Sequence, residues 1–224
     1  MTTIDYAKAR ETMVEQQVRP WDVLNIRVLE ALSALPREAF VPPAYRALAY
    51  ADLPVPIGHG ECMFKPVVEG RMLQSLALLP TDEVLEIGTG SGFIAACLGR
   101  LARDVLSLEI HPDLAEAARV RLAEQGLDGN VRVETVDALH YQTQRRFDAI
   151  CITGAVAAIP PQFVQWLRPG GRLFAVHGRE PAMAAVLLQQ PADDQTVNGQ
   201  RIESLFETVV PYLVGAAPTP AFQF

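Results

Sequence analysis

The sequence predicts an α/β protein built on a doubly wound, mostly parallel sheet, and three observations lead to this fold class. Strand-like and helix-like segments alternate over residues 83–177. The apolar run 84–87 ends in a glycine-rich turn, 88–92, which leads into an apolar helical pattern. A second apolar run, 105–108, ends at the acidic residue Glu109. In open parallel sheets, ligands bind beyond the carboxyl ends of the strands, so we expect a site at this turn.

The first 80 residues are predicted to form a helical extension of the sheet. Helix-period apolar positions over 5–18 and 21–35 are separated by Arg19 and Pro20. Residues 45–60 are predicted to be an irregular, proline-rich loop with three buried side chains: Leu53, Val55 and Ile57. Pro66 is well placed to open a helix that runs to about residue 79. The apolar side of this helix is expected to contain Val67, Met72, Leu73 and Leu76.

The rest of the chain supplies the sheet. We expect strands at 83–87, 104–109, 131–136, 147–153 and 171–177, with helices at 91–102, 112–126 and 158–168. The glycine-rich turn 168–171 feeds the last of these strands. Two closing antiparallel strands are expected at 183–190 and 202–214, around a polar loop at 193–200. The chain is expected to be a single domain, divided into 1–80, a cofactor-binding core at 81–180, and closing strands at 181–224.

Composition narrows the class of protein. A chain of 224 residues that is 50% hydrophobic can bury a substantial core. A net charge of −7 argues against a nucleic-acid-binding surface. No apolar stretch reaches the roughly 20 residues of a membrane span, and the N-terminus lacks the features of a signal peptide. The three cysteines, Cys62, Cys97 and Cys151, are expected to be reduced thiols of a cytoplasmic protein. His59 and Cys62 alone do not make a metal site, and none is predicted.

The glycine-rich turn identifies a class of cofactor. Its pattern is Glu86-x-Gly88-x-Gly90-x-Gly92, which differs from the dinucleotide fingerprint, and no phosphate-binding Gly-Lys-Ser/Thr follows. The acidic Glu109 lies 17 residues beyond Gly92, a spacing that suits a carboxylate holding ribose hydroxyls. The turn resembles the first motif of class I S-adenosylmethionine-dependent methyltransferases, whose sheet is Rossmann-like.

This resemblance implies a site for S-adenosyl-L-methionine. The turn would hold the amino-acid tail of the cofactor, Glu109 and the neighbouring Ile110 its ribose, and Asp137 and Ala138 its adenine. The turn residues expected to bind are Glu86, Gly88, Thr89, Gly90, Ser91 and Gly92. His111, two residues after Glu109, would either contact the ribose or adenine or be exposed to solvent, and exposure is the favoured expectation.

Longer segments narrow the resemblance to one family. Residues 34–42, 49–60, 84–93, 147–150, 159–160 and 167–173 resemble the protein-L-isoaspartate O-methyltransferase family, and the likeness covers nearly the whole chain. The family-specific part is Pro36 to Gly60. The resemblance implies a cytosolic enzyme that methylates the side carboxylate of isoaspartyl residues in damaged proteins, so its partner would be an isoaspartyl-containing protein or peptide. No general base is required, because such a carboxylate is already ionised at neutral pH.

The chain departs from the family next to the expected acceptor. After residues 57–60 the family typically reads Gln-Thr-Ile-Ser-Gln-Pro, and its serine hydroxyl lies at the reacting centre. Here residues 61–66 read Glu-Cys-Met-Phe-Lys-Pro, which puts Phe64 at the serine position. A hydrogen bond to a carboxylate contributes about 1.5–3 kcal/mol, so losing it lowers rate or affinity roughly 10- to 150-fold if nothing replaces it.

Several residues of this segment have more than one interpretation. Glu61, Cys62 and Met63 fall on positions that line the cofactor in the family. His59 would either meet the substrate or simply satisfy its tight loop, and Lys65 is either a cation beside the acceptor or a surface lysine. Two alternatives to isoaspartyl methylation remain open. One is methylation of a different, small or apolar acceptor, and the other is a non-catalytic S-adenosylmethionine-binding protein.

Overall fold

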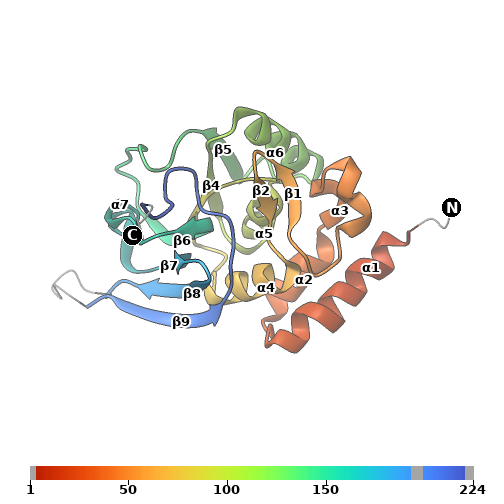
Figure 1. The fold of residues 1–224 in the computed structure, drawn as a ribbon, viewed down its shortest axis with the longest axis horizontal. Coiled ribbons are helices and arrows are strands. Elements are labelled where there is room, and N and C mark those ends of the chain that lie inside the picture. Colours follow the sequence, from red (N-terminus) through yellow and green to blue (C-terminus); the bar gives the residue numbers. More distant parts are fainter. Residues whose placement is uncertain (1–3, 193–198, 220–224) are drawn as a thin grey trace, which may run out of the picture.

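The computed structural model describes residues 4–192 and 199–219 and contains a seven-stranded sheet in the order β5-β4-β3-β6-β7-β8-β9 (Figure 1). The first five of these strands in spatial order are parallel. The order reverses between β3 and β6, which creates the crevice where ligands bind in doubly wound sheets. The predicted fold class is confirmed. Most of the predicted polar loop, residues 193–198, lies outside the described residues.

The parallel strands follow the predicted apolar runs. Strands β3 (Glu83–Ile87) and β4 (Asp104–Glu109) have the predicted bounds, and β5 (Val131–Thr135) ends one residue early. Strands β6 (Phe147–Val156) and β7 (Leu167–Arg179) are longer than predicted. The helices between them are α5 (Phe93–Leu101), α6 (Pro112–Glu124) and α7 (Pro161–Gln165). The prediction of a helix over 158–168 was wrong in length, because Pro160 and Pro161 delay its start and Leu167 already begins β7.

The two faces of the sheet carry separate cores. Val84 packs in a cluster with α5, α6 and the N-terminal helices, whereas Leu85 and Ile87 pack in a second cluster with the α7 residues Phe163 and Val164. Figure 1 shows α7 on the opposite side of the sheet from α5 and α6. Successive side chains of a strand point to opposite faces, so Glu86 lies on the face of Val84.

The N-terminal extension is helical but more broken than predicted. Its helices are α1 (Tyr6–Thr12), α2 (Ile26–Ala34), α3 (Arg37–Phe40) and α4 (Pro66–Ser75). The chain continues from α1 through a π-helical segment, Met13–Val18, and a short 3₁₀ helix, Arg19–Trp21. The second helix starts later than predicted, because Asp22 is left-handed with φ 62° and the Asn25 side chain caps α2. The predicted apolar side of α4 is buried.

The prediction of an irregular loop over 45–60 was wrong in part. A 3₁₀ helix spans Pro43–Leu48, and an antiparallel hairpin follows, made of β1 (Val55–Gly58) and β2 (Glu61–Met63). Val55 is fully buried, whereas Leu53 and Ile57 are half-buried. The hairpin leads directly into α4 and lies beside α5 and α6 in Figure 1.

The C-terminal region also differs from the prediction. Strands β8 (Ala182–Gln189) and β9 (Arg201–Glu207) extend the sheet antiparallel, as predicted, but no strand continues to residue 214. Instead the chain leaves β9 and returns to β6, where the Ala155 amide donates to the Pro211 carbonyl and the Leu213 amide donates to the Ala155 carbonyl. Pro211 has no amide hydrogen to donate to a strand ladder. This return places residues 213–214 at the carboxyl end of the sheet.

Candidate cofactor and acceptor site

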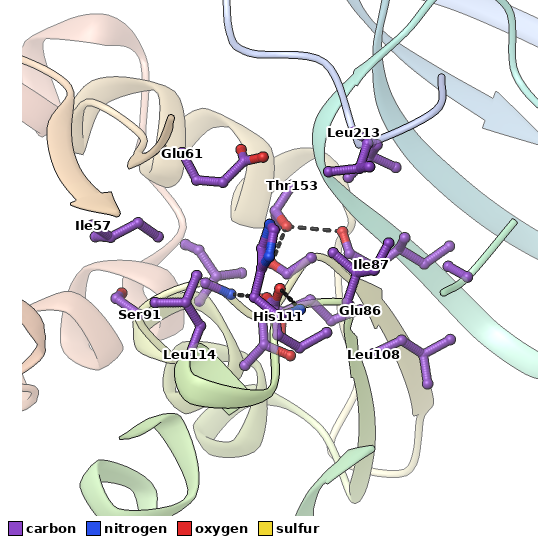
Figure 2. A pocket seen from close by; sticks show the side chains of 18 of the residues that line it. Ile57, Glu61, Glu86, Ile87, Ser91, Leu108, His111, Leu114, Thr153 and Leu213 are labelled. Carbon is purple, nitrogen blue, oxygen red and sulfur yellow. Dashed lines mark hydrogen bonds between the residues drawn. The ribbon is translucent and has the colours of Figure 1, made fainter. Parts of the chain in front are cut away.

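A cavity of about 830 Å³, counted out to its open mouth, lies between the carboxyl ends of β3 and β4 and the hairpin β1–β2 (Figure 2). Every residue predicted to bind cofactor lines this cavity except Gly92, and Phe64 lines it as well. His59 does not line it. The structure thus brings the predicted residues of four separate segments to one place.

The glycine turn presents bare backbone to the cavity because side chains do not fit there. Gly88 has φ 98°, and a Cβ on it would lie 2.6 Å from Thr153 Oγ1. Gly90 has φ 53°, and its Cβ would lie 2.9 Å from Ile57 Cδ1 of the hairpin. L-residues rarely adopt these conformations. A ligand can therefore approach the turn closely, just ahead of the N-terminus of α5.

Gly92 has a different role from the other turn glycines. It is the N-cap of α5, with φ 87°, and a Cβ on it would meet Ala118 Cβ at 3.1 Å. It therefore allows α5 and α6 to pack closely beneath the turn, which explains why it does not reach the cavity.

Glu109 ties the turn to the end of β4. Its side chain is buried, and the Gly90 amide donates to Oε2 (2.7 Å) while the His111 amide donates to Oε1 (3.0 Å). Each carboxylate oxygen accepts more than one hydrogen bond, so the group retains acceptor capacity toward the cavity. This arrangement fits a carboxylate that receives ribose hydroxyls.

Glu86 is the most deeply buried carboxyl of the cavity. It is fully buried, the Ser107 hydroxyl donates to its Oε2, and its Oε1 has no hydrogen-bond partner among the described residues. Burial raises the pKa of Glu86 to about 8, opposed by the Ser107 hydrogen bond and reinforced by the charge of Glu109. A buried acceptor without a partner fits a ligand that carries a cation or a donor.

Asp137 organises the opposite wall. The Leu139 amide donates to Oδ1 (2.8 Å), and His140 Nδ1 lies 2.7 Å from Oδ2. This turn holds Ala138 in the lining, and Gln162 of α7 donates to the Leu139 carbonyl (2.9 Å). The backbone here is thus fixed from two sides, as a wall that contacts an adenine ring requires.

Phe64 is buried at the end of the hairpin, with 5% of its surface exposed. Its carbonyl accepts a hydrogen bond from Arg37 Nη2 (2.7 Å), and Arg37 also donates to both carboxylate oxygens of Glu69 and to the Ala49 carbonyl (2.6 Å). The guanidinium also lies 5.3 Å from the Phe93 ring centre. Burial raises the pKa of Glu69, while Arg37 counteracts this rise. This buried network fixes the backbone at the expected acceptor position.

The cavity is lined by acidic groups and, within the described residues, by no lysine or arginine. Its carboxyl groups are Glu61, Glu69, Glu86, Glu109 and Asp137. Burial raises the pKa of Glu61, which extends over the cavity from β2 in Figure 2. Lys65 is exposed at the N-cap of α4 and does not line the cavity. Glu69 is paired with Arg37, and Glu86, with a pKa of about 8, is mostly protonated near neutral pH. The negative charge of the cavity therefore comes mainly from Glu61, Glu109 and Asp137, and it favours a cationic ligand.

Some lining residues were missed by the sequence analysis. They include Ile57, Thr153, Leu114, Leu213 and Val214, and His111 lines the cavity as well. The prediction that His111 is exposed was wrong: it is half-buried, and its ring stacks on that of His59. Only tertiary folding brings residues 213–214 to β6, so no local pattern identifies them.

The described ranges 4–192 and 199–219 contain neither a metal-binding cluster nor a membrane-spanning helix. No cluster of three or more potential metal ligands occurs in them. Nor does any helix there have the length and apolar character needed to cross a lipid bilayer. Cys62, Cys97 and Cys151 are free thiols, and burial raises the pKa of each.

The fold and the cavity together define a class I S-adenosylmethionine-dependent methyltransferase, with a glycine turn after β3, an acidic residue after β4, and sheet order reversed at β3 and β6. Comparison with known proteins narrows this class. The family model "Protein-L-isoaspartate(D-aspartate) O-methyltransferase (PCMT)" matches residues 8–212. The chain therefore belongs to the protein-L-isoaspartate O-methyltransferase family.

Individual relatives agree with this assignment. A protein-L-isoaspartate O-methyltransferase of Methylorubrum extorquens (strain PA1) is 43% identical over 169 residues, which cover 75% of this chain and 74% of the relative. A protein-L-isoaspartate O-methyltransferase of Aeropyrum pernix is 38% identical over 209 residues, which cover 92% of this chain and 80% of the relative. A solved structure from Plasmodium falciparum, described as a protein of this kind in complex with S-adenosyl-L-homocysteine, shares the fold. Its TM-score is 0.78 at 17% identity, with 94% of this chain and 99% of that chain covered.

Proposed function

We propose that this protein transfers the methyl group of S-adenosyl-L-methionine to the free carboxylate of L-isoaspartyl residues in proteins and peptides. The observation that carries the proposal is the family match over residues 8–212, which includes the hairpin and every lining residue of the cavity except Leu213 and Val214. When bound, the cofactor supplies an electrophilic methyl group on a cationic sulfonium. The residues of this chain bind the cofactor and the acceptor and orient them for the transfer.

The residues that face the cofactor bind it and fix its orientation. The backbone of the turn 88–91 and the carboxyl of Glu86 receive the amino-acid tail, Glu109 and Ile110 the ribose, and Asp137 and Ala138 the adenine. Glu61, Cys62 and Met63 close the cavity from the hairpin. The unpartnered Oε1 of Glu86 supports this assignment, because a cationic amino group would satisfy it.

The residues that face the acceptor position its carboxylate and do not need to remove a proton from it. A carboxylate acceptor is ionised near neutral pH, so rate enhancement comes from alignment with the methyl group and from exclusion of water. Arg37 of α3, which is paired with Glu69 of α4, supports the Phe64 carbonyl, and Leu213 and Val214 border the cavity on another side. On this proposal the single domain divides into an acceptor-covering part at 1–80, a cofactor-binding core at 81–180, and closing strands at 181–224.

Methyl transfer from labelled S-adenosylmethionine tests the proposed function. We expect label on an isoaspartyl peptide and none on its normal aspartyl twin, with the product a base-labile methyl ester. S-adenosylhomocysteine should raise the melting temperature of the protein, because it binds only the folded state. Absence of any binding of S-adenosylhomocysteine would overturn the proposed class of enzyme.

A second candidate function has one specific observation in its favour. Phe64 places a buried aromatic ring, without a hydrogen-bonding group, in the lining of the cavity, and Glu61 adds a carboxyl there. Both features suit a small or apolar acceptor better than a carboxylate. Binding of S-adenosylhomocysteine together with no transfer to the isoaspartyl peptide would support this second function.

We also propose a cytoplasmic location. The free thiols Cys62, Cys97 and Cys151 support it, because extracellular proteins more often pair their cysteines. Fractionation of cells that produce the protein, followed by immunodetection, tests this proposal.

A further inference from the structure

The His111 side chain lies in the cofactor cavity, yet the proposed function gives it no role. It lines the cavity next to Glu109, and its ring nitrogen Nε2 is buried without a hydrogen-bond partner among the described residues. Figure 2 shows it among the lining side chains, with Glu61 above it. A buried polar atom that stays unpaired costs about 1–3 kcal/mol. The position of Nε2 therefore points to a ligand group that pairs with it.

The His111 ring is held by a second histidine from the hairpin. The rings of His59 and His111 stack with centres 4.0 Å apart and planes 11° apart. His59 Nε2 in turn lies 2.9 Å from Oδ2 and 3.0 Å from Oδ1 of Asp113, in the first turn of α6. Asp113, His59 and His111 thus form one bracket, which joins the tip of the hairpin to the start of α6.

The backbone at the hairpin tip is adapted to this bracket. His59 has φ 54°, which is uncommon for a residue other than glycine, and its neighbours Gly58 and Gly60 are also left-handed. Such a conformation persists only where the surroundings enforce it. Here the surroundings are the Asp113 carboxylate and the His111 ring.

We propose that His111 binds the ribose hydroxyls of the cofactor through Nε2, and that His59 and Asp113 are positioning residues that hold its ring for this contact. The inference rests on the proposed S-adenosylmethionine cofactor. Its location follows from the backbone, because the His111 amide donates to the same Glu109 carboxylate that is expected to receive the ribose. An imidazole nitrogen can donate to or accept from a hydroxyl, so it complements a carboxylate, which only accepts.

Binding of truncated cofactors tests the contact itself. Methylthioadenosine contains the nucleoside without the amino-acid tail, and its 2′,3′-dideoxy analogue lacks both ribose hydroxyls. We expect His111→Phe, which keeps a flat ring for stacking, to weaken methylthioadenosine roughly 5- to 30-fold by calorimetry. The same variant should bind the dideoxy analogue as well as the wild type does. Equal losses with both ligands, or no loss with either, would overturn the contact.

The positioning role has its own matched variants. Asp113→Asn weakens the hold on His59, while Glu116→Gln removes a carboxylate of similar exposure one turn further along α6. We expect Asp113→Asn to weaken methylthioadenosine by roughly 2- to 5-fold, a smaller effect than that of His111→Phe, and to leave the dideoxy analogue unaffected. Glu116→Gln should bind both ligands as the wild type does. Identical behaviour of the two variants would overturn the positioning role.

A spectroscopic readout separates ligand contact from structural support. In protein labelled with ¹⁵N-histidine, the Nε2 resonance of His111 should shift when methylthioadenosine binds and stay in place when the dideoxy analogue binds. An Nε2 resonance that responds identically to both ligands contradicts the inference. Thermal melts of each variant establish that it is folded.

The outcome for the wild type distinguishes this inference from the proposed function. A wild-type protein that binds neither S-adenosylhomocysteine nor methylthioadenosine overturns both. A wild type that binds both ligands, with His111→Phe binding equally well, overturns the role of His111 and leaves the proposed function intact.

Discussion

Two neighbouring carboxyl groups at the ends of β3 and β4 are buried in different ways. Glu109 is satisfied by two backbone amides, and it holds the glycine turn in place before any ligand binds. Glu86 has only the Ser107 hydroxyl, so one of its oxygens is left unpaired in the cavity. On the proposed function, Glu109 both holds the turn in place and receives the ribose, whereas Glu86 pairs with the cationic amino group of the cofactor.

Glu86 gives the folded protein a distinctive pH dependence. Its pKa rises from 4.5 to about 8 on burial, so between these values the folded state keeps a proton that the unfolded state releases. Stability contributed by this group is therefore lost as the pH rises through this window, by at most about 1.4 kcal/mol per pH unit. The free energy of unfolding in urea, measured at several pH values, checks this.

The control for this titration is Glu86→Gln, which cannot ionise. The wild type should lose stability relative to this variant as the pH rises toward about 8. Parallel pH profiles of the two proteins would contradict the assignment. Glu69, whose pKa is also raised by burial, is present in both proteins and cancels in the comparison.

At the residue scale, the sequence was enough to place the candidate cofactor residues at the ends of β3 and β4, but not to predict the packing around His111. Glu86, the turn glycines and Glu109 stand at fixed distances from apolar strands, so their place follows from strand ends. His111 was misjudged because its burial depends on His59, 52 residues away in the chain and brought over it by the hairpin. No local pattern encodes that contact.

At the scale of elements, the glycine turn and the hairpin form the two surfaces of the site. The turn admits no side chain at Gly88 or Gly90, and Ile57 of the hairpin packs directly against the turn. The hairpin was missed from the sequence because its strands are only four and three residues long. Such a hairpin is not stable alone and forms through its packing on the body of the protein.

Gly88→Ala tests the turn, with Gly126→Ala as its matched control. Both glycines are left-handed, but a Cβ on Gly88 would lie 2.6 Å from Thr153 Oγ1, whereas one on Gly126 meets nothing within 4 Å. We expect both variants to lose about 1 kcal/mol of stability from backbone strain, and Gly88→Ala to lose more because Thr153 must move. Only Gly88→Ala should also lose binding of S-adenosylhomocysteine by calorimetry. Equal binding by both variants would contradict a turn shaped for close approach of the ligand.

The buried pair of Arg37 and Glu69 joins α3 to α4 and supports the Phe64 carbonyl. Both side chains are almost wholly buried. Arg37→Met leaves a buried carboxylate without its partner, which typically costs about 3–5 kcal/mol in the free energy of unfolding. Arg19→Met removes an exposed pair with Glu15 and should cost no more than about 1 kcal/mol.

The double variant Arg37→Met/Glu69→Met completes this experiment. Removing both charges should recover part of the loss, because no unpaired charge then remains buried. Urea denaturation of the single and double variants measures how much of the free energy of unfolding is recovered. A double variant that recovers none of the loss would show that the cost comes mainly from the unpaired Ala49 and Phe64 carbonyls and not from the buried charge of Glu69.

At the scale of the whole molecule, the N-terminal helices belong to the same core as the sheet. One cluster extends from Met13 to Val210, and Val18 packs so closely on Gly70 that a Cβ there would lie 2.6 Å from Val18 Cγ1. The fold class followed from the alternating strand and helix segments, the glycine-rich turn 88–92 and the acidic strand end at Glu109. The course of residues 208–214 could not be predicted from the sequence, because only contacts with β6 determine it.

This shared core predicts cooperative unfolding. The chain has two tryptophans, the exposed Trp21 and the buried Trp166 on the other face of the sheet. In a Trp21→Phe variant, Trp166 fluorescence and far-UV circular dichroism should give coincident transitions in urea. A separate, earlier loss of circular dichroism would instead show that the N-terminal helices unfold independently.

The central claim is that this cavity methylates isoaspartyl carboxylates with Phe64 at its acceptor end. The specificity constant kcat/KM for an isoaspartyl peptide, measured for the wild type and for Phe64→Ser, tests it most directly. We expect measurable transfer by the wild type and an increase of roughly 10- to 150-fold in the variant, because a hydroxyl restores a hydrogen bond to the carboxylate. A wild type that binds S-adenosylhomocysteine yet transfers no methyl group to the isoaspartyl peptide would contradict the claim.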